Sequence, residues 1–176
     1  MGCGLCCDGT LFLAVPVEDD DPLEALRAAG IPLRQHQRSR SFTQPCPALR
    51  AGRCVAYASR PAACRAYRCH TLAGATEGTL SWEEAEKEVE RAVTLRRRIE
   101  EALERLLGPA PHQAMAERMV EALQRLEDAD DLLSARREHA GLLLDVSALG
   151  ELVARSFSPA RDAHATTTPA NKKVRA

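Results

Sequence analysis

Seven cysteines lie within the first 69 residues of this 176-residue chain, and the rest of the chain has none. They are Cys3, Cys6, Cys7, Cys46, Cys54, Cys64 and Cys69. Thiolates are soft ligands that suit zinc, copper(I) and iron–sulfur centres. Cysteines used only for packing would be scattered along the chain, so their confinement indicates one local site. We expect at least four of the seven thiols to bind metal.

The spacing within Cys3-Gly4-Leu5-Cys6-Cys7 indicates which thiols can share an ion. Two residues separate Cys3 from Cys6, so both sulfurs can reach one ion from a single turn. Adjacent side chains point apart, so we expect Cys7 to turn toward a second metal, to bridge two metals or to pack in the core. The later cysteines would supply the other half of a split site. A metal bound by both halves would cross-link the loops of the N-terminal part.

Three other roles for the cysteines compete with metal binding. Cys46 and Cys54 are the best candidates for small core residues. Disulfides are disfavoured because the count is odd and the sequence favours a reducing compartment. A redox Cys-x-x-Cys site is disfavoured because no βαβ pattern surrounds the cysteines. His70, next to Cys69, is either a further ligand or an exposed residue outside the coordination sphere.

Composition excludes several classes of function. The net charge of −1 gives no field that would recruit nucleic acid, and an aromatic content of 3% is too low for a base-stacking surface. No stretch approaches the ~20 apolar residues of a membrane span. The cysteine-rich start does not fit a signal peptide. We therefore expect a cytoplasmic protein with no nucleic-acid and no membrane partner.

Short elements are expected to surround the first cysteines. The apolar residues 11–15 predict a strand. Asp21-Pro22 predicts the start of a helix over 23–29, and Gly30 predicts its end. Residues 32–44 are polar and basic, which predicts an exposed loop anchored to the core by its one phenylalanine.

The last cysteines are expected on a ribbon and a short helix. Gly52 predicts a turn between two short strands that contain Leu49 and Val55. Ser59 is predicted to cap a helix of about residues 60–67. Residues 71–78 then predict a connector.

Helical periodicity dominates the second half of the chain. Ser81 and Glu84 form a capping box, which predicts a helix over 82–107. A second helix is predicted over 112–137, and the short gap between them favours an antiparallel hairpin. Leu142-Leu143-Leu144 and then residues 146–157 predict a third, short helix that closes the hairpin.

These patterns predict a mainly α protein. Its small, metal-stapled, cysteine-rich N-terminal part would contain little β structure, and a long antiparallel helical hairpin and a short third helix would follow. The predicted divisions are a cysteine-cluster domain over 1–78, a helical hairpin packed on it over 79–157, and a disordered tail over 158–176.

The cysteine blocks and their neighbours resemble a known family. The matching blocks are Cys3-x-x-Cys6-Cys7, Cys46-Pro47-x-Leu49, Gly52-x-Cys54-x-x-Tyr57 and Arg60-Pro61-x-x-Cys64-Arg65-x-Tyr67-x-Cys69. This pattern resembles the CxxCxxCC cysteine-cluster family of YkgJ-like zinc- or iron-chelating proteins, and it is similar to the cysteine-rich part of flagellin lysine N-methylases. The resemblance implies a cysteine-bound zinc or iron, including an iron–sulfur cluster, but no established reaction.

One ligand of the family pattern falls outside this sequence. A further cysteine three residues before Cys3 would stand just before Met1. Either this chain lacks that ligand or a longer chain supplies it.

The sequence thus predicts a metal-binding protein whose reaction is unassigned. One alternative is a modification enzyme whose metal is catalytic. Another is a helical module whose 82–137 hairpin binds a protein partner while the metal is structural. An open coordination position would favour the enzyme, and saturation by thiolates would favour a structural metal.

Overall fold

The structure is a computed structural model that describes residues 2–160, and in that part helices predominate. The strands are β1 (Ala14–Val17), β2 (Arg34–His36), β3 (Ser39–Thr43), β4 (Leu49–Arg50) and β5 (Arg53–Cys54). The α-helices are α1 (Leu23–Ala28), α2 (Ala62–Ala66), α3 (His70–Glu77), α4 (Trp82–Leu107), α5 (Met115–Glu127), α6 (Leu132–Glu138) and α7 (Ala140–Leu152). A 3-10 turn, η1 (Tyr57–Ser59), precedes α2, and a π-helical turn, η2 (Val153–Phe157), follows α7. The predicted mainly α class, with its small sheets near the N-terminus, is confirmed.

Three antiparallel strands in the order β1-β3-β2 form the larger sheet. Val15 of β1 pairs with Phe42 of β3, and both side chains are buried. The prediction of a loop over 32–44 is wrong, because this segment forms the β2–β3 hairpin. Polar composition concealed the hairpin, since Phe42 is the only buried residue on its two strands. The predicted ribbon is present, with Leu49 of β4 opposite Cys54 of β5.

The carboxylate of Asp21 joins two segments that are distant in sequence. Its side chain is 5% exposed, and it does not cap α1 as the sequence suggested. One carboxylate oxygen accepts a hydrogen bond from the Glu18 N–H at 2.9 Å, and the other accepts one from the Ala62 N–H at 2.6 Å. Ala62 begins α2, so a buried anion holds the N-terminus of that helix, where the helix dipole favours negative charge. Ser59, the predicted cap, instead donates to the Ala56 carbonyl.

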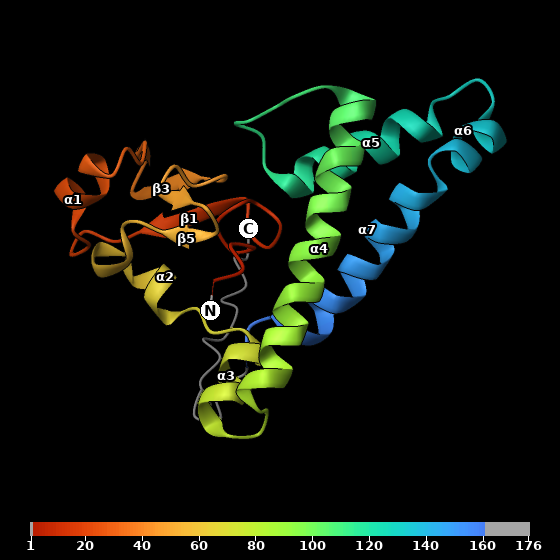
Figure 1. Cartoon of the computed structure of the whole chain (residues 1–176). Coiled ribbons are helices and arrows are strands. Elements are labelled where there is room, and N and C mark those ends of the chain that lie inside the picture. Colours follow the sequence, from red (N-terminus) through yellow and green to blue (C-terminus); the bar gives the residue numbers. More distant parts are fainter. Residues whose placement is uncertain (1, 161–176) are drawn as a thin grey trace, which may run out of the picture.

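The long helix α4 organises the second half of the described chain (Figure 1). Its predicted bounds and its capping box of Ser81 and Glu84 are observed. α4 packs most extensively against α7, which runs back along it in the opposite direction, whereas α5 crosses near its C-terminal end. The predicted helix over 112–137 is broken between α5 and α6, where Asp131 accepts a hydrogen bond from the Ser134 N–H at 3.0 Å and starts a new helix.

Two further elements differ from the sequence prediction. The expected connector over 71–78 is the helix α3, which Gly78 ends with a φ of 77°. The predicted third helix is not short: α7 begins at Ala140, two residues before the buried Leu142, and continues into the π-helical turn η2.

Two hydrophobic cores are present. The helix-side core lies among α4, α5, α7 and η2 and contains Leu95, Ile99, Leu103, Leu149 and Phe157. The sheet-side core is smaller and contains Val15, Val17, Leu26, Ile31 and Phe42.

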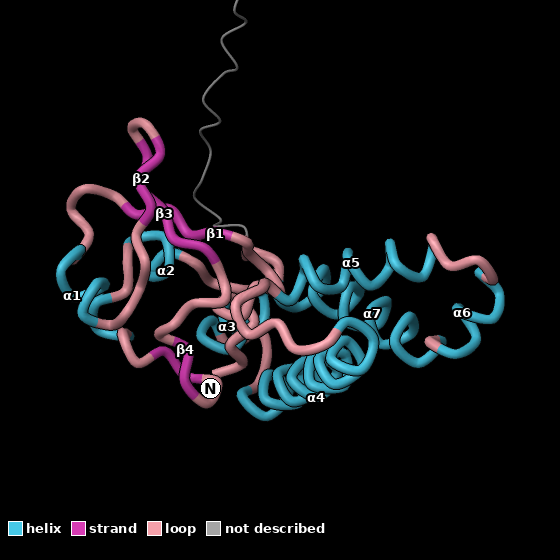
Figure 2. The backbone as a smooth tube through the Cα atoms, turned by 90° about the horizontal axis from the view of Figure 1, so that it is seen from above, coloured by secondary structure: helices cyan, strands magenta, loops and turns pink. Residues whose placement is uncertain are grey.

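The N-terminal loop before β1 lies between the sheet and the helices (Figures 1 and 2). Its Leu5 is fully buried in the helix-side core. The N–H groups of Met115 and Ala116, at the start of α5, donate to the carbonyls of Asp8 and Gly9 at 3.2 and 3.0 Å. Amides at a helix start need partners outside the helix, and here the loop supplies them.

The predicted domain boundary at residue 78 stays a prediction. Residues 158–160 of the predicted tail are paired with the chain around Cys69: the His70 N–H donates to the Ser158 carbonyl at 3.1 Å, and the Ala160 N–H donates to the Arg68 carbonyl at 2.9 Å. The remainder of that tail, 161–176, lies outside the described residues. Within residues 2–160, every helix is too short or too polar to cross a bilayer.

We expect Gly9→Ala to loosen the contact between the loop and α5. A Cβ at Gly9, where φ is 85°, would lie 2.4 Å from the Ala114 Cβ. Gly78→Ala is the matched control, since its φ is also positive but nothing lies within 4 Å. The steric clash should destabilise Gly9→Ala by about 2 kcal/mol more than Gly78→Ala in chemical denaturation. Equal losses would show that the loop is not packed against α5.

Asp21→Ala should destabilise the protein by about 3 kcal/mol, because two backbone donors lose a charged acceptor. Asp20→Ala is the control, since Asp20 is exposed and should change the free energy of unfolding by less than about 0.5 kcal/mol. The measurement is urea denaturation followed by circular dichroism. A similar small effect for both variants would contradict the role assigned to Asp21.

Candidate metal centre

The first three thiols project from a tight turn. The N–H groups of Cys7 and Asp8 donate to the Gly4 carbonyl at 2.8 and 3.0 Å, and Gly4 has a φ of 74° that favours glycine. Leu5 points into the helix-side core. The turn therefore fixes Cys6 and Cys7 immediately beside a buried anchor.

Residues 44–46 are bonded directly to this turn. The Cys46 N–H donates to the Cys7 carbonyl at 2.7 Å. The Gln44 side-chain amide donates to the Cys6 carbonyl at 3.0 Å. The structure thus brings the first and second halves of the cysteine set together.

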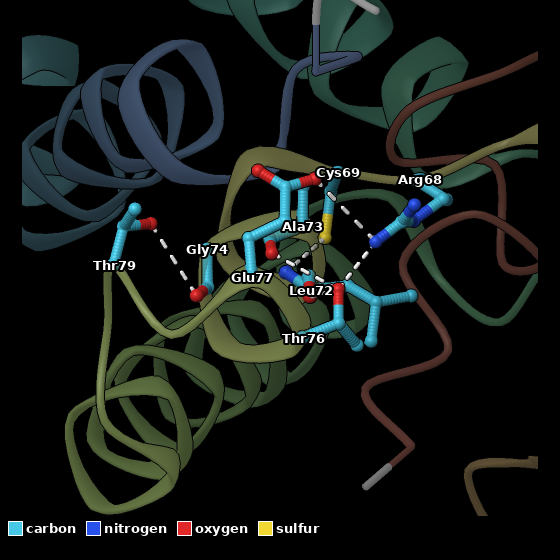
Figure 3. A network of polar contacts seen from close by, with 8 residues as sticks. All are labelled: Arg68, Cys69, Leu72, Ala73, Gly74, Thr76, Glu77 and Thr79. Atoms are coloured by element: carbon cyan, nitrogen blue, oxygen red, sulfur yellow. Dashed lines mark hydrogen bonds and ion pairs between the residues drawn. The ribbon is translucent and has the colours of Figure 1, made fainter.

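The remaining thiols come from three separate elements. Cys54 is the last residue of β5, and Cys64 lies in α2. Cys69 is the N-cap of α3, where its sulfur accepts a hydrogen bond from the Leu72 N–H at 3.4 Å (Figure 3).

Arg68 stabilises α3 beside Cys69 (Figure 3). Its guanidinium donates to the Thr76 hydroxyl and lies 3.7 Å from the Glu77 carboxylate. Thr76 in turn bonds the carbonyls of the preceding turn of the helix. These contacts fix the helix that presents the Cys69 sulfur.

The thiols fall into two groups according to the core that they touch. The sheet-side thiols pack on the sheet-side core and are Cys7, Cys46, Cys54 and Cys64. The helix-side thiols, Cys3 and Cys69, pack on the helix-side core. Cys6 lies between the groups, since its charge raises the pKa of Cys3 on one side and of Cys46 and Cys64 on the other.

Cys6 and Cys7 form the closest pair, with 3.5 Å between their sulfurs. A hydrogen bond from the Cys7 thiol lowers the pKa of Cys6 to about 7. The same bond, together with burial, raises the pKa of Cys7. The pair therefore loses its first proton more readily than an ordinary thiol and its second less readily.

Burial is the largest cause of the pKa shifts of three further thiols. It raises the pKa of Cys3 to about 11 and that of Cys64 to about 11, and it also raises the pKa of Cys46. Neighbouring thiolates act in the same direction. A cluster of buried thiols resists ionisation unless positive charge is supplied, and a metal ion supplies it.

The phenol of Tyr67 faces the helix-side thiols. Burial raises the pKa of Tyr67, and the charges of Cys69, Cys6 and Cys3 add to this shift. Its hydroxyl donates to the Phe157 carbonyl, and its ring meets Phe12 edge-on with 4.8 Å between centroids. Tyr67 thus joins the thiol region to the end of the helical part.

Arginines contribute positive charge to the thiol region. Arg60 lowers the pKa of both Cys6 and Cys64 through its charge. Its guanidinium stacks 3.7 Å above the ring of Tyr57, which is 65% exposed. Arg65 lies 3.8 Å from the buried Asp21 carboxylate.

Soft sulfur donors in this number fit zinc or iron. In residues 2–160, however, no three His, Cys, Asp or Glu side chains are gathered tightly enough to hold an ion as they stand. The thiols are nevertheless near enough for the charge of Cys6 to raise the pKa of Cys3, Cys46 and Cys64. His70, considered as a ligand from the sequence, has an exposed side chain at the start of α3.

Sequence reasoning missed two residues of this region. Gln44 was placed in an exposed loop, but it is 5% exposed and bonded to the Cys6 carbonyl. Asp8 is also buried, with Arg96 of α4 at 3.6 Å. Their positions next to cysteines were a signal, but their burial depends on contacts with distant segments.

Comparison with known proteins identifies a family. Residues 1–92 match the model of the CxxCxxCC family, described as a "putative zinc- or iron-chelating domain". The chain matches neither a curated protein nor a solved structure. The match covers more than half of the 176 residues and contains all seven cysteines. The chain therefore belongs to the CxxCxxCC family.

Proposed function

We propose that the chain binds zinc or iron through its clustered cysteine thiolates, and that the bound metal staples the sheet-side part to the helices. The observation that carries this proposal is the convergence of thiols from separate segments on the N-terminal loop. Both cores touch that loop, so a metal held there would cross-link them. The ligands that we propose are Cys3, Cys6, Cys7, Cys46, Cys54, Cys64 and Cys69.

The composition of the sheet-side core supports a stabilising role for the metal. Phe42 is the only aromatic residue in that core, and several of its other members are alanines or a cysteine. Such a core stabilises a fold only weakly, whereas structural zinc contributes roughly 10–16 kcal/mol in small domains. The sheet-side thiols are four in number, which is the ligand count of a closed tetrahedral site.

The charge balance also supports thiolate ligation. Four thiolates on a divalent ion leave a net charge of about −2, and a nearby cation offsets part of it. Arg60 already acts on two of the thiols in this way. A metal bound by thiolates is also consistent with the cytoplasmic location that we propose, where cysteines stay reduced.

Metal content of protein purified without oxygen is the first test. We expect zinc or iron in stoichiometric amount, and a chelator should lower the melting temperature. Colour separates the metals, because an iron–sulfur cluster absorbs visible light and zinc does not. Folded protein that is free of both metals would overturn the proposal.

Cys64→Ser should weaken metal binding by about 100-fold, since roughly 10–16 kcal/mol is shared among four ligands in structural zinc sites. Ala63→Ser is the matched control, because it adds the same hydroxyl one residue away on α2 and should bind as tightly as the unaltered chain. Affinities are measured by competition with a chromophoric chelator. Equal affinities for the two variants would remove Cys64 from the ligand set.

Metal affinity should rise with pH between 6 and 8. The pKa values of Cys3 and Cys64 are raised to about 11 in the metal-free chain, so both thiols are protonated in this range and must lose protons on binding. Each released proton adds about one order of magnitude in affinity per pH unit. Competition titrations at several pH values, corrected for the chelator, measure the slope. A flat profile would contradict ligation by these thiols.

A further inference from the structure

Gln44 combines deep burial with an unpartnered oxygen in the thiol region. Its side chain is 5% exposed, and its backbone N–H donates to the Leu13 carbonyl at 2.9 Å. Its Nε2 donates to the Cys6 carbonyl, while its Oε1 is buried and has no hydrogen-bond partner in the described part of the chain. A buried acceptor without a donor is unfavourable, so this oxygen calls for an explanation.

The orientation of the Gln44 amide is determined by its partner. Only the NH₂ group can donate to the Cys6 carbonyl, and exchanging the two ends would place two acceptors together. The Oε1 atom is therefore the end without a partner. It lies on the same planar amide as the nitrogen that holds the cysteine turn.

The contacts of residues 44–46 orient both cysteines of the adjacent pair. Gln44 holds the carbonyl of Cys6, and the Cys46 N–H holds the carbonyl of Cys7. Because peptide units are planar, fixing these two carbonyls fixes the backbone on both sides of the Cys7 Cα and on the C-terminal side of the Cys6 Cα. Gln44 is thus the side chain that holds the backbone from which the Cys6 and Cys7 sulfurs project.

We propose that Gln44 is a positioning residue of the thiolate centre: its Nε2 fixes the backbone from which the Cys6 and Cys7 sulfurs project, and its unpartnered Oε1 is the cost of that orientation. This inference rests on the proposed function, because it assigns Gln44 a part in that same site. It goes beyond the thiols by naming a residue that determines metal affinity without itself being a cysteine ligand.

Gln44→Met tests the proposal in the full chain, with Gln35→Met as its matched control. Methionine keeps the approximate length of glutamine but cannot donate to the Cys6 carbonyl. Gln35 also donates from its side chain to a backbone carbonyl, that of Gln37, but it is exposed. We expect Gln44→Met to weaken zinc binding by about 10- to 100-fold, as loss of an outer-shell partner does, and Gln35→Met to leave it unchanged.

Two readouts separate positioning from a general structural role. The visible spectrum of the cobalt(II)-loaded protein reports the ligand geometry and should change in Gln44→Met only. Melting temperatures of the metal-free proteins report stability alone. Unchanged affinity and spectrum, or a loss of affinity fully accounted for by lower stability of the metal-free protein, would overturn the proposal.

A crystal structure of the unaltered, zinc-loaded chain is a second test that needs no variant. We expect an intact bond of about 3 Å from Nε2 to the Cys6 carbonyl. A Gln44 side chain turned away from Cys6 would contradict the inference. If the unaltered chain binds no zinc or iron, the proposed function fails, whereas metal binding that is insensitive to Gln44 refutes only the role of Gln44.

Discussion

The N-terminal loop belongs to two cores at once, and the rest of the structure depends on this constraint. Leu5 is buried among the long helices, while Cys7, two residues later, packs on the sheet-side core. The carbonyls of Asp8 and Gly9 then accept the first amides of α5. A loop held from both sides cannot move without disturbing both, so the thiols that it carries stay at the junction.

The packing of the N-terminal loop changes how readily its thiols ionise. Because the loop is packed from both sides, its thiols lose part of their contact with water, and burial raises the pKa of Cys3 and of Cys64. Buried thiols that crowd together repel when they ionise, which makes the metal-free cluster unfavourable as a set of thiolates. A bound cation offsets both the lost hydration of the thiolates and their mutual repulsion. The packing that joins the two cores therefore also favours metal binding.

Local signals explain what the sequence could predict. The bounds of α4 follow from a capping box and a terminal glycine, which need no knowledge of distant contacts. The β2–β3 hairpin was missed because its pairing with β1 is non-local and only Phe42 on its two strands is buried. The spacing of Cys3 and Cys6 suggested a shared ion, but the grouping of Cys3 with Cys69 depends on how α3 packs against the helices. The burial of Gln44 was likewise not predictable, since it depends on tertiary contacts alone.

The central claim is that sulfur atoms from both ends of the cysteine segment bind one metal centre. X-ray absorption spectroscopy of the loaded full-length chain, at the edge of whichever metal is present, measures the ligands directly. For zinc, the account predicts a first shell dominated by sulfur at about 2.3 Å. A first shell made mainly of nitrogen or oxygen near 2.0 Å would contradict it.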